Sequence, residues 1–162
     1  MIVYHGGYTS VVEPKIIIPS RSLDFGSGFY ATTSLEQAQK WSLIKKDRFH
    51  YDEAVVSWYE FDDTVFDSTF YKCLFFKKAN EEWLDFVISN RRNINFNYDY
   101  DIVRGAVAND NVYASLNLYE NGFISKEDLL KELRTWVYVD QICFHTKKSL
   151  ECLKYIKSEE VK

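Results

Sequence analysis

The sequence predicts a single α+β domain in which strands and helices are mixed without regular alternation. Segments rich in β-branched and aromatic residues predict strands, whereas capping residues followed by apolar residues every three or four positions predict helices. A doubly wound α/β fold would alternate strands and helices regularly, and this chain does not. Because its 162 residues suit one domain, we place that domain at residues 1–157 and a C-terminal tail at residues 158–162.

Six segments have the composition of strands. They are Ile2–His5, Lys15–Ile18, Phe29–Ala31, Ala54–Phe61, Ile102–Ala108 and Val137–Thr146. Gly6-Gly7 is predicted to form a turn after the first of them, and the stretch from Pro19 to Gly28 is predicted to be a loop.

Five segments are predicted to be helical. Ser34, with Gln37 three residues later, has the capping-box spacing and begins a helix through about Lys45. Asn80 is predicted to cap a second helix, in which apolar residues recur at helical spacing. The last four helices are Glu81–Asn90, Asp110–Glu120, a segment from Ser125 to about Arg134, and Lys148–Ile156.

Composition and charge exclude several classes of protein. The net charge is −4 and the acidic and basic residues are interleaved, which is not the basic surface expected of a protein whose main partner is nucleic acid. The N-terminal segment lacks the pattern of a signal peptide, and no stretch of 18 apolar residues could span a membrane. The three cysteines show no C-x-x-C spacing, so we expect no metal site, no disulfide framework and a cytoplasmic location.

Three segments place unusual residues at the ends of predicted strands. His5 is followed by two glycines, which allow close approach of a ligand to the backbone. Tyr30 and Trp41 flank a strand-to-helix connection and could sandwich a flat heterocycle, although each could equally belong to the core. Gln141 lies at the head of a late strand. Neither a G-x-G-x-x-G motif between a strand and a helix nor a P-loop is present, which disfavours the two common nucleotide-binding routes.

Taken together and in this order, the three segments resemble the ADP-ribosyltransferase superfamily, in the branch shared by diphtheria toxin and the poly(ADP-ribose) polymerases. That branch has a His-Gly pair ending one strand, then Phe-Gly-x-Gly-x-Tyr, a second aromatic eleven residues later, and a glutamate heading a late strand. The matching positions here are His5-Gly6, Phe25-Gly26-Ser27-Gly28-Phe29-Tyr30, Trp41 and Gln141.

The chain is also similar, over nearly its whole length, to a bacterial family of uncharacterised domains in this superfamily. The strings that carry this likeness are Asp24–Tyr30, Gln37-Ala38, Glu82–Phe86 with Asn90-Arg91, Tyr100–Val103, Gly105-x-Val107-Ala108-x-Asp110 and Gln141-x-Cys143-Phe144. The combination is specific, whereas any one string alone is not.

The resemblance implies a split mixed or antiparallel sheet with flanking helices and an NAD cleft. His5 would bond a ribose hydroxyl of NAD, the backbone of Gly6 would meet the nicotinamide carboxamide, and Tyr30 and Trp41 would stack on the nicotinamide ring. The implied NAD-binding set is His5, Gly6, Phe25, Gly28, Tyr30, Trp41 and Arg91. The implied catalytic set is His5, Tyr30 and Gln141.

Two positions depart from the pattern of the superfamily. Gln141 stands where active members carry glutamate, so it keeps hydrogen bonding without negative charge. Slow transfer, a carboxylate supplied elsewhere (Asp140, Asp110 or Glu60), and NAD binding without turnover all remain open. Ala38 stands where polymerase-type members tend to carry a serine. For Arg91, contact with the adenosine or pyrophosphate and structural pairing with Asp101 or Asp110 are both open.

The resemblance therefore predicts an NAD-dependent mono-ADP-ribosyltransferase that modifies an intracellular macromolecule, protein or nucleic acid. By family analogy it would be the toxin of a toxin–antitoxin or phage-conflict pair, with a cognate antitoxin as partner. The alternatives are a weak or inactive NAD-binding or nucleotide-binding module and an NAD glycohydrolase. Acceptor choice is expected to depend on loops beside the cleft, at Ser42–Asp52 and Asn93–Asp99.

Overall fold

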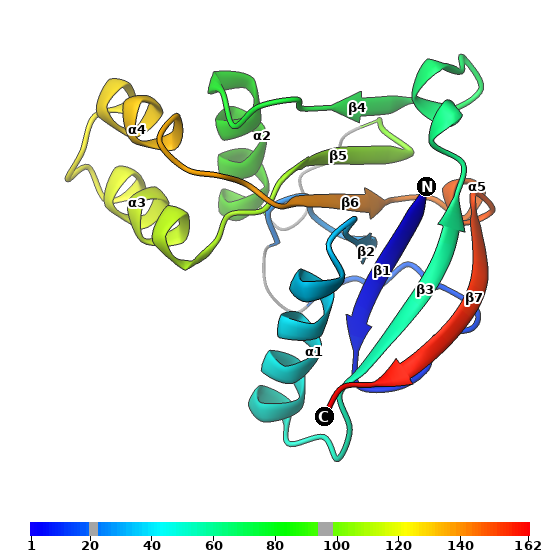
Figure 1. Ribbon diagram of the computed structural model, residues 1–162. Helices are drawn as coiled ribbons and strands as arrows, with labels where there is room; N and C mark the ends of the chain where they lie inside the picture. The colour runs from blue at the N-terminus through cyan, green and yellow to red at the C-terminus, as the bar shows by residue number, and fades with distance from the viewer. Residues whose placement is uncertain (20–22, 94–98) are drawn as a thin grey trace.

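The computed structural model describes residues 1–19, 23–93 and 99–162, and these form an α+β fold around two β-sheets (Figure 1). The first sheet has the order β1-β3-β7, and its strands are β1 (Ile2–Gly7), β3 (Val55–Phe61) and β7 (Leu153–Glu160). The second has the order β2-β6-β5-β4, and its strands are β2 (Phe29–Ala31), β6 (Asp140–Phe144), β5 (Ile102–Ala106) and β4 (Cys73–Phe75). Neighbouring strands are antiparallel, except that β4 and β5 are parallel.

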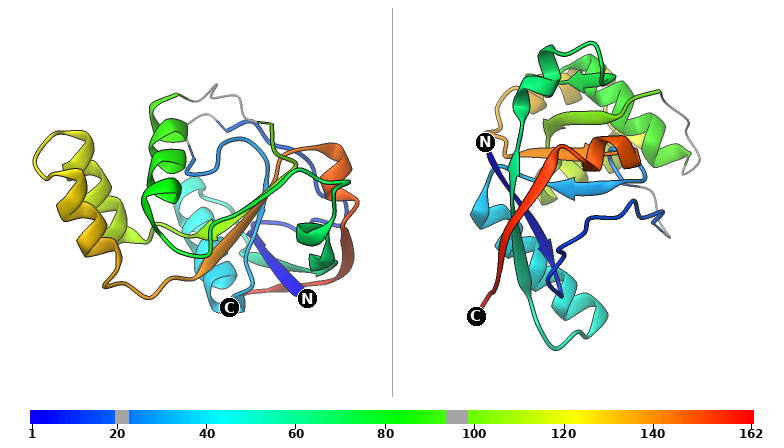
Figure 2. Two further views of the ribbon diagram at one scale, coloured as in Figure 1. Left: turned by 90° about the horizontal axis from the view of Figure 1, so that it is seen from above. Right: turned by 90° about the vertical axis from the view of Figure 1, so that its right-hand side faces the viewer.

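The helical segments flank these sheets. They are α1 (Leu35–Phe49), the 3-10 segment η1 (Asp63–Asp67), α2 (Glu81–Arg92), α3 (Asp110–Glu120), α4 (Lys126–Leu133) and α5 (Lys147–Leu150). Figure 1 shows α3 and α4 side by side, projecting away from the three-stranded sheet, and the left-hand view of Figure 2 shows the same arrangement from above. Within the described ranges, no helix is both long and apolar enough to cross a membrane.

Two hydrophobic clusters define the layers. One cluster lies between the sheets and joins Val3, Tyr59 and Phe61 of the first sheet to Phe29 and Phe144 of the second. The other lies on the opposite face of the four-stranded sheet, where α2, α3 and α4 cover it. Helix α1 packs against β1. The order of layers is therefore α1, three-stranded sheet, four-stranded sheet, and the helices α2 to α4.

The predicted starts of α1, α2 and α4 are confirmed, and each start is fixed by a local hydrogen bond. The side chains of Ser34, Asn80 and Ser125 accept from the third residue downstream and cap α1, α2 and α4. The predicted bounds of α3 are also confirmed. Helix α1 is longer than predicted and ends at Phe49, where His50 adopts a left-handed conformation with φ 55°.

Several predicted elements differ from those in the structure. Gly6 and Gly7 belong to β1 instead of forming a turn. The predicted strand Lys15–Ile18 contains only an isolated bridge from Ile17 to Gly28. The predicted closing helix Lys148–Ile156 is the short α5 followed by β7, and β7 runs to Glu160, into the stretch that we placed in a C-terminal tail. Strand β4 was not predicted.

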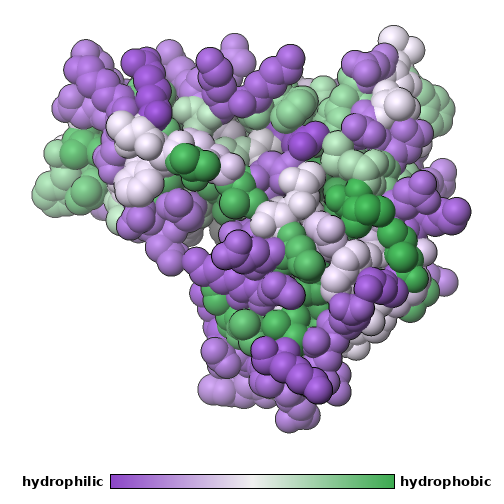
Figure 3. All heavy atoms as spheres, in the orientation of Figure 1, coloured by the Kyte–Doolittle hydropathy of each residue, from purple (hydrophilic) through white to green (hydrophobic). Residues whose placement is uncertain are grey.

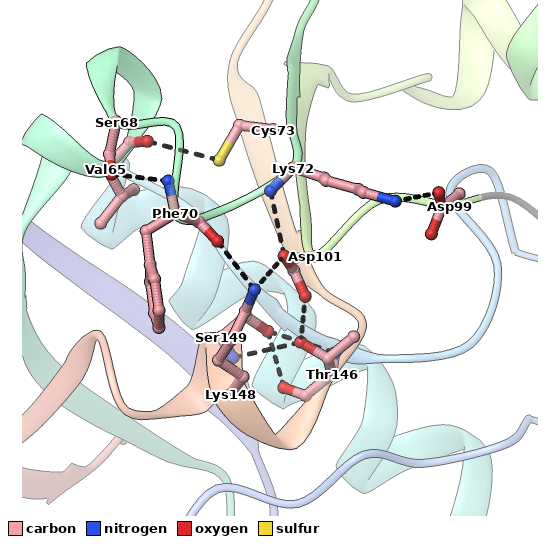
Figure 4. Close-up of polar contacts among 10 residues, drawn as sticks. All are labelled: Val65, Ser68, Phe70, Lys72, Cys73, Asp99, Asp101, Thr146, Lys148 and Ser149. Carbon is pink, nitrogen blue, oxygen red and sulfur yellow. Dashed lines mark hydrogen bonds and ion pairs between the residues drawn. The ribbon is translucent and has the colours of Figure 1, made fainter.

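Asp101 ties three distant segments together at the start of β5 (Figure 4). Its carboxylate accepts hydrogen bonds from the backbone N–H of Lys72 and the hydroxyl of Thr146, and it forms an ion pair with Lys148 at 2.9 Å. Burial alone would raise the pKa of Asp101, but these hydrogen bonds outweigh it and the pKa is lowered. This network fixes the start of β4 and the cap of α5 against the central strand.

Candidate functional site

Strands β1 and β2 meet at one residue pair and then separate. Tyr4 and Thr32 exchange two backbone hydrogen bonds, of 2.8 and 2.9 Å. Continuing this antiparallel register would place Gly6 opposite Tyr30. The carbonyl of Tyr30 instead accepts a hydrogen bond from Nδ1 of His5, at 2.6 Å. We call this divergence, with the side chains around it, the β1–β2 fork.

The imidazole of His5 is held in one orientation at the fork. A carbonyl can only accept, so Nδ1 carries the proton and Nε2 of the neutral ring is an acceptor. The ring stacks on Phe29 with centroids 4.4 Å apart. Burial and, after it, the positive charge of Lys45 together lower the pKa of His5 to about 3, although the hydrogen bond to the Tyr30 carbonyl opposes the shift. His5 is therefore neutral at physiological pH and offers an acceptor to a hydroxyl group.

Gly6 is required by the packing of α1. A Cβ at this position would lie 2.1 Å from the carbonyl oxygen of Ala38 and 3.0 Å from the backbone nitrogen of Ser42. The carbonyl of Gly6 accepts a hydrogen bond from Nζ of Lys45, at 2.6 Å. Burial lowers the pKa of Lys45 to about 8. The sequence did not predict this contact of Lys45 with Gly6, although Lys45 lies on the same helical face as Ala38 and Trp41.

The two candidate stacking residues come from the elements that flank the fork. Tyr30 lies on β2 and its hydroxyl donates to the carbonyl of Gly26, at 2.6 Å. Trp41 lies on α1, four residues before Lys45, and its side chain is half-buried. The sequence prediction that these two rings stack on one ligand remains a prediction.

Gln141 is buried on the same face of the four-stranded sheet as Tyr30. Tyr30 is paired with Cys143, two residues from Gln141, and side chains two apart on a strand share a face. The amide nitrogen of Gln141 donates to the carbonyl of Ala106 at 3.4 Å, beside a 3.1 Å bond from the indole of Trp83. His5 lies toward Phe29, on the other face. The structure thus joins His5 to the backbone of Tyr30 and leaves Gln141 deeper in the fold.

The neighbouring carboxylate of Asp140 is occupied elsewhere. It faces away from Gln141 and forms an ion pair with Arg104 at 2.8 Å, and its second oxygen accepts from the backbone and hydroxyl of Thr33. It therefore has no free oxygen to direct at the fork.

Two predicted ligand contacts, Phe25 and Gly28, have structural roles here. Phe25 is fully buried and packs on Phe76 and Phe86. A Cβ on Gly28 would lie 2.6 Å from both Sγ of Cys143 and the carbonyl oxygen of Phe144, so close packing on β6 requires glycine there.

Arg91 joins α2 to α3. Its guanidinium forms an ion pair with Glu120 at 2.9 Å, donates to Asn117 and lies over the ring of Tyr113. Structural pairing is therefore observed, but with Glu120 and not with Asp101 or Asp110, the partners weighed from the sequence.

The predicted acceptor loops are only partly described. Most of Ser42–Asp52 is the second half of α1 and not a loop. Residues 94–98 of the second predicted loop lie outside the described residues. In the described part of the chain, no group of three or more His, Cys, Asp or Glu side chains could hold a metal ion.

The surface is notched between the lobe that contains α3 and α4 and the part that contains α1 (Figure 3). A groove of about 990 Å³ is lined by α2, α4 and the segments 77–80 and 134–138, and a neighbouring one of about 200 Å³ reaches Gly105 and Asp140. Neither groove is lined by His5, Tyr30 or Trp41.

Residues 1–155 match a family model described as Protein of unknown function (DUF3990). The chain belongs to this family. The DUF3990 match runs from β1 into β7 and includes every residue of the fork. A search of curated proteins gave no match, and a search of solved structures also gave none.

Proposed function

We propose that this DUF3990 protein is an NAD-dependent mono-ADP-ribosyltransferase with its site at the β1–β2 fork. The observation that carries the proposal is the state of His5: a neutral imidazole fixed through Nδ1 to Tyr30, with Nε2 left as an acceptor. A ribose hydroxyl is the complementary donor. The ADP-ribosyltransferase-like fold itself, with its split sheet, is part of this proposal.

The chemistry needs positioning more than covalent participation by the protein. The bond between the ribose C1′ and the nicotinamide nitrogen breaks, the electron pair leaves with the nitrogen, and a nucleophile of the acceptor bonds to C1′ and loses its proton. His5 would orient the ribose, while Tyr30 and Trp41 would hold the ring. In this scheme the acceptor is a macromolecule inside the cell. The idea that the protein is the toxin of a toxin–antitoxin pair rests on family resemblance alone.

A second candidate is an NAD-binding module with little or no turnover. It is favoured by the engagement of Gln141 with Ala106 and of Asp140 with Arg104, because neither side chain is then directed at the fork to stabilise a ribosyl cation. Loss of one oriented electrostatic group reduces kcat by about 10²–10³-fold in well-studied enzymes. The two candidates share a binding site and differ in rate.

The test is transfer of label from NAD labelled in its adenylate phosphate to bacterial lysate. We expect labelled protein or nucleic acid with the wild type and its loss in His5→Ala. His50→Asn is the matched control, because His50 caps α1 outside the fork and asparagine tolerates its left-handed backbone.

The remaining outcomes separate the candidates. Equal labelling by wild type and His5→Ala would refute the proposed site. Absence of label, with NAD binding that quenches tryptophan fluorescence and is lost in His5→Ala, would favour the binding module. Loss of NAD without labelled macromolecules would instead indicate a glycohydrolase.

A further inference from the structure

The larger surface groove lies between two connections of the chain. One connection, residues 77–80, joins β4 to α2, and the other, residues 134–138, joins α4 to β6 (Figure 1). The groove has a volume of about 990 Å³ and shares four lining residues with the neighbouring groove of about 200 Å³. The two therefore adjoin, and together they exceed the range of about 300–1,000 Å³ that is typical of small-molecule sites. Their size suits a segment of a partner chain.

One wall of the groove is apolar and comes from α4 and the segment after it. Leu130 and Trp136 are half-buried there, beside the buried Leu133. Val137, the residue that follows Trp136, is 93% exposed. Apolar surface that is gathered in this way and rimmed by polar residues is typical of protein–protein contacts. A partner's apolar side chains would bury surface here that now faces water.

The rim of the groove carries three cations that have no acidic partner. Lys77, Lys78 and Arg134 line the groove and are exposed. In the described part of the chain, none of the three takes part in an ion pair. The protein as a whole has a net charge of −4, so three unpaired cations around one groove run against its overall charge. They would attract the carboxylates of a ligand.

The carboxylates that line the groove all lie on α2. Two of them, Glu81 and Asp85, pair with Lys126, at 2.7 and 2.9 Å, and Glu82 is the third. The unpaired cations come from the two connections, whereas the remaining negative charge comes from the helix. A ligand is therefore expected to direct its own carboxylates at the connections and its apolar side chains at α4.

We propose that this groove docks a short acidic segment of a partner protein. The apolar side chains of that segment pack on Leu130 and Trp136. Its carboxylates pair with Lys77, Lys78 and Arg134. One exposed ion pair contributes little, but three cations around an apolar surface select against neutral and basic segments. The inference is independent of the proposed function, because neither His5, Tyr30 nor Trp41 lines the groove.

The probe is a displayed library of random heptapeptides, selected on the full-length wild type. We expect the recovered peptides to be enriched in sequences that place two or more acidic residues beside a large apolar one. The most frequent peptide is then synthesised, and its affinity is measured by fluorescence anisotropy at low and at high salt. The affinity should fall as salt rises, because the contacts at the rim are ionic and exposed.

The double variant Lys78→Glu/Arg134→Glu reverses two of the three rim charges. We expect it to bind the selected peptide about tenfold more weakly than the wild type does. It should in turn prefer a peptide in which lysine replaces each acidic residue. Lys15→Glu/Lys40→Glu is the matched control, since both lysines are exposed, lie outside the groove and give the same change in net charge. Melting temperatures verify that both double variants are folded.

The outcomes decide the inference directly. Recovered peptides without acidic enrichment would show that the rim does not select charge. Equal affinity of the selected peptide for the wild type and for Lys78→Glu/Arg134→Glu, or equal weakening by the control, would place its binding elsewhere and overturn the inference. An exchange of preference from the acidic to the basic peptide would assign the contact to the groove, because a loss of structure alone cannot reverse a preference.

Discussion

Replacing Gly6 with alanine should destabilise the protein strongly, because the new methyl group would collide with main chain. The ideal Cβ lies 2.1 Å from the carbonyl oxygen of Ala38 and 3.0 Å from the nitrogen of Ser42, and both atoms belong to α1. A normal contact requires separation by more than an additional ångström, so α1 must move away from β1. Overpacking of this kind costs about 1–3 kcal/mol, and a clash with backbone belongs at the upper end.

For a domain of this size, a loss of about 3 kcal/mol lowers the melting temperature by roughly 6–12 °C. The assay is thermal unfolding followed by circular dichroism. Gly7→Ala is the matched control, since a Cβ there would approach no atom more closely than 3.4 Å, the distance to the ring of His5. We expect that variant to melt within about 2 °C of the wild type. If Gly6→Ala melts no lower than Gly7→Ala, the packing account of Gly6 is wrong.

Three further predictions concern titratable or polar positions. The pKa of His5 is lowered to about 3, so below pH 6.5 the unfolded chain binds a proton that the folded chain does not. The free energy of unfolding should therefore fall by about 1 kcal/mol per pH unit below pH 6.5. Urea unfolding at several pH values should show this slope, and the slope should be smaller in His5→Gln. Because the pKa of Asp101 is lowered, Asp101→Asn should reduce the free energy of unfolding by about 2 kcal/mol at pH 7. This difference from the wild type should shrink below pH 4, where acid protonates the wild-type carboxylate. An unchanged difference at pH 3 would contradict this account. Gln141→Glu should reduce the free energy of unfolding by about 1–3 kcal/mol at neutral pH, since an ionised carboxylate cannot donate a hydrogen bond to the carbonyl of Ala106. The stability should recover in acid, where the new carboxyl group is protonated. Increased nicotinamide release by this variant would show that only the charge was lacking at the site.

The helix boundaries could be predicted because their causes are local. Asn80 and Ser125 accept hydrogen bonds from residues three positions away, so the signal is complete within one turn of sequence. Strand β7 shows the opposite case. Its sequence, Leu153–Glu160, is rich in Lys and Glu and mostly exposed, and it becomes a strand because it pairs with β3, about a hundred residues earlier. Strand β4 has only three residues and no periodicity to detect.

The candidate site was predictable to a lesser extent. The sequence places His5 and Tyr30 in two predicted strands, and the structure joins them through a hydrogen bond. The sequence does not show that Phe25 and Gly28 serve the packing of the core, because glycine and aromatic residues are typical of both binding sites and cores. The bond of Lys45 to Gly6 was not predicted, since it spans 39 positions and depends on how closely α1 approaches β1.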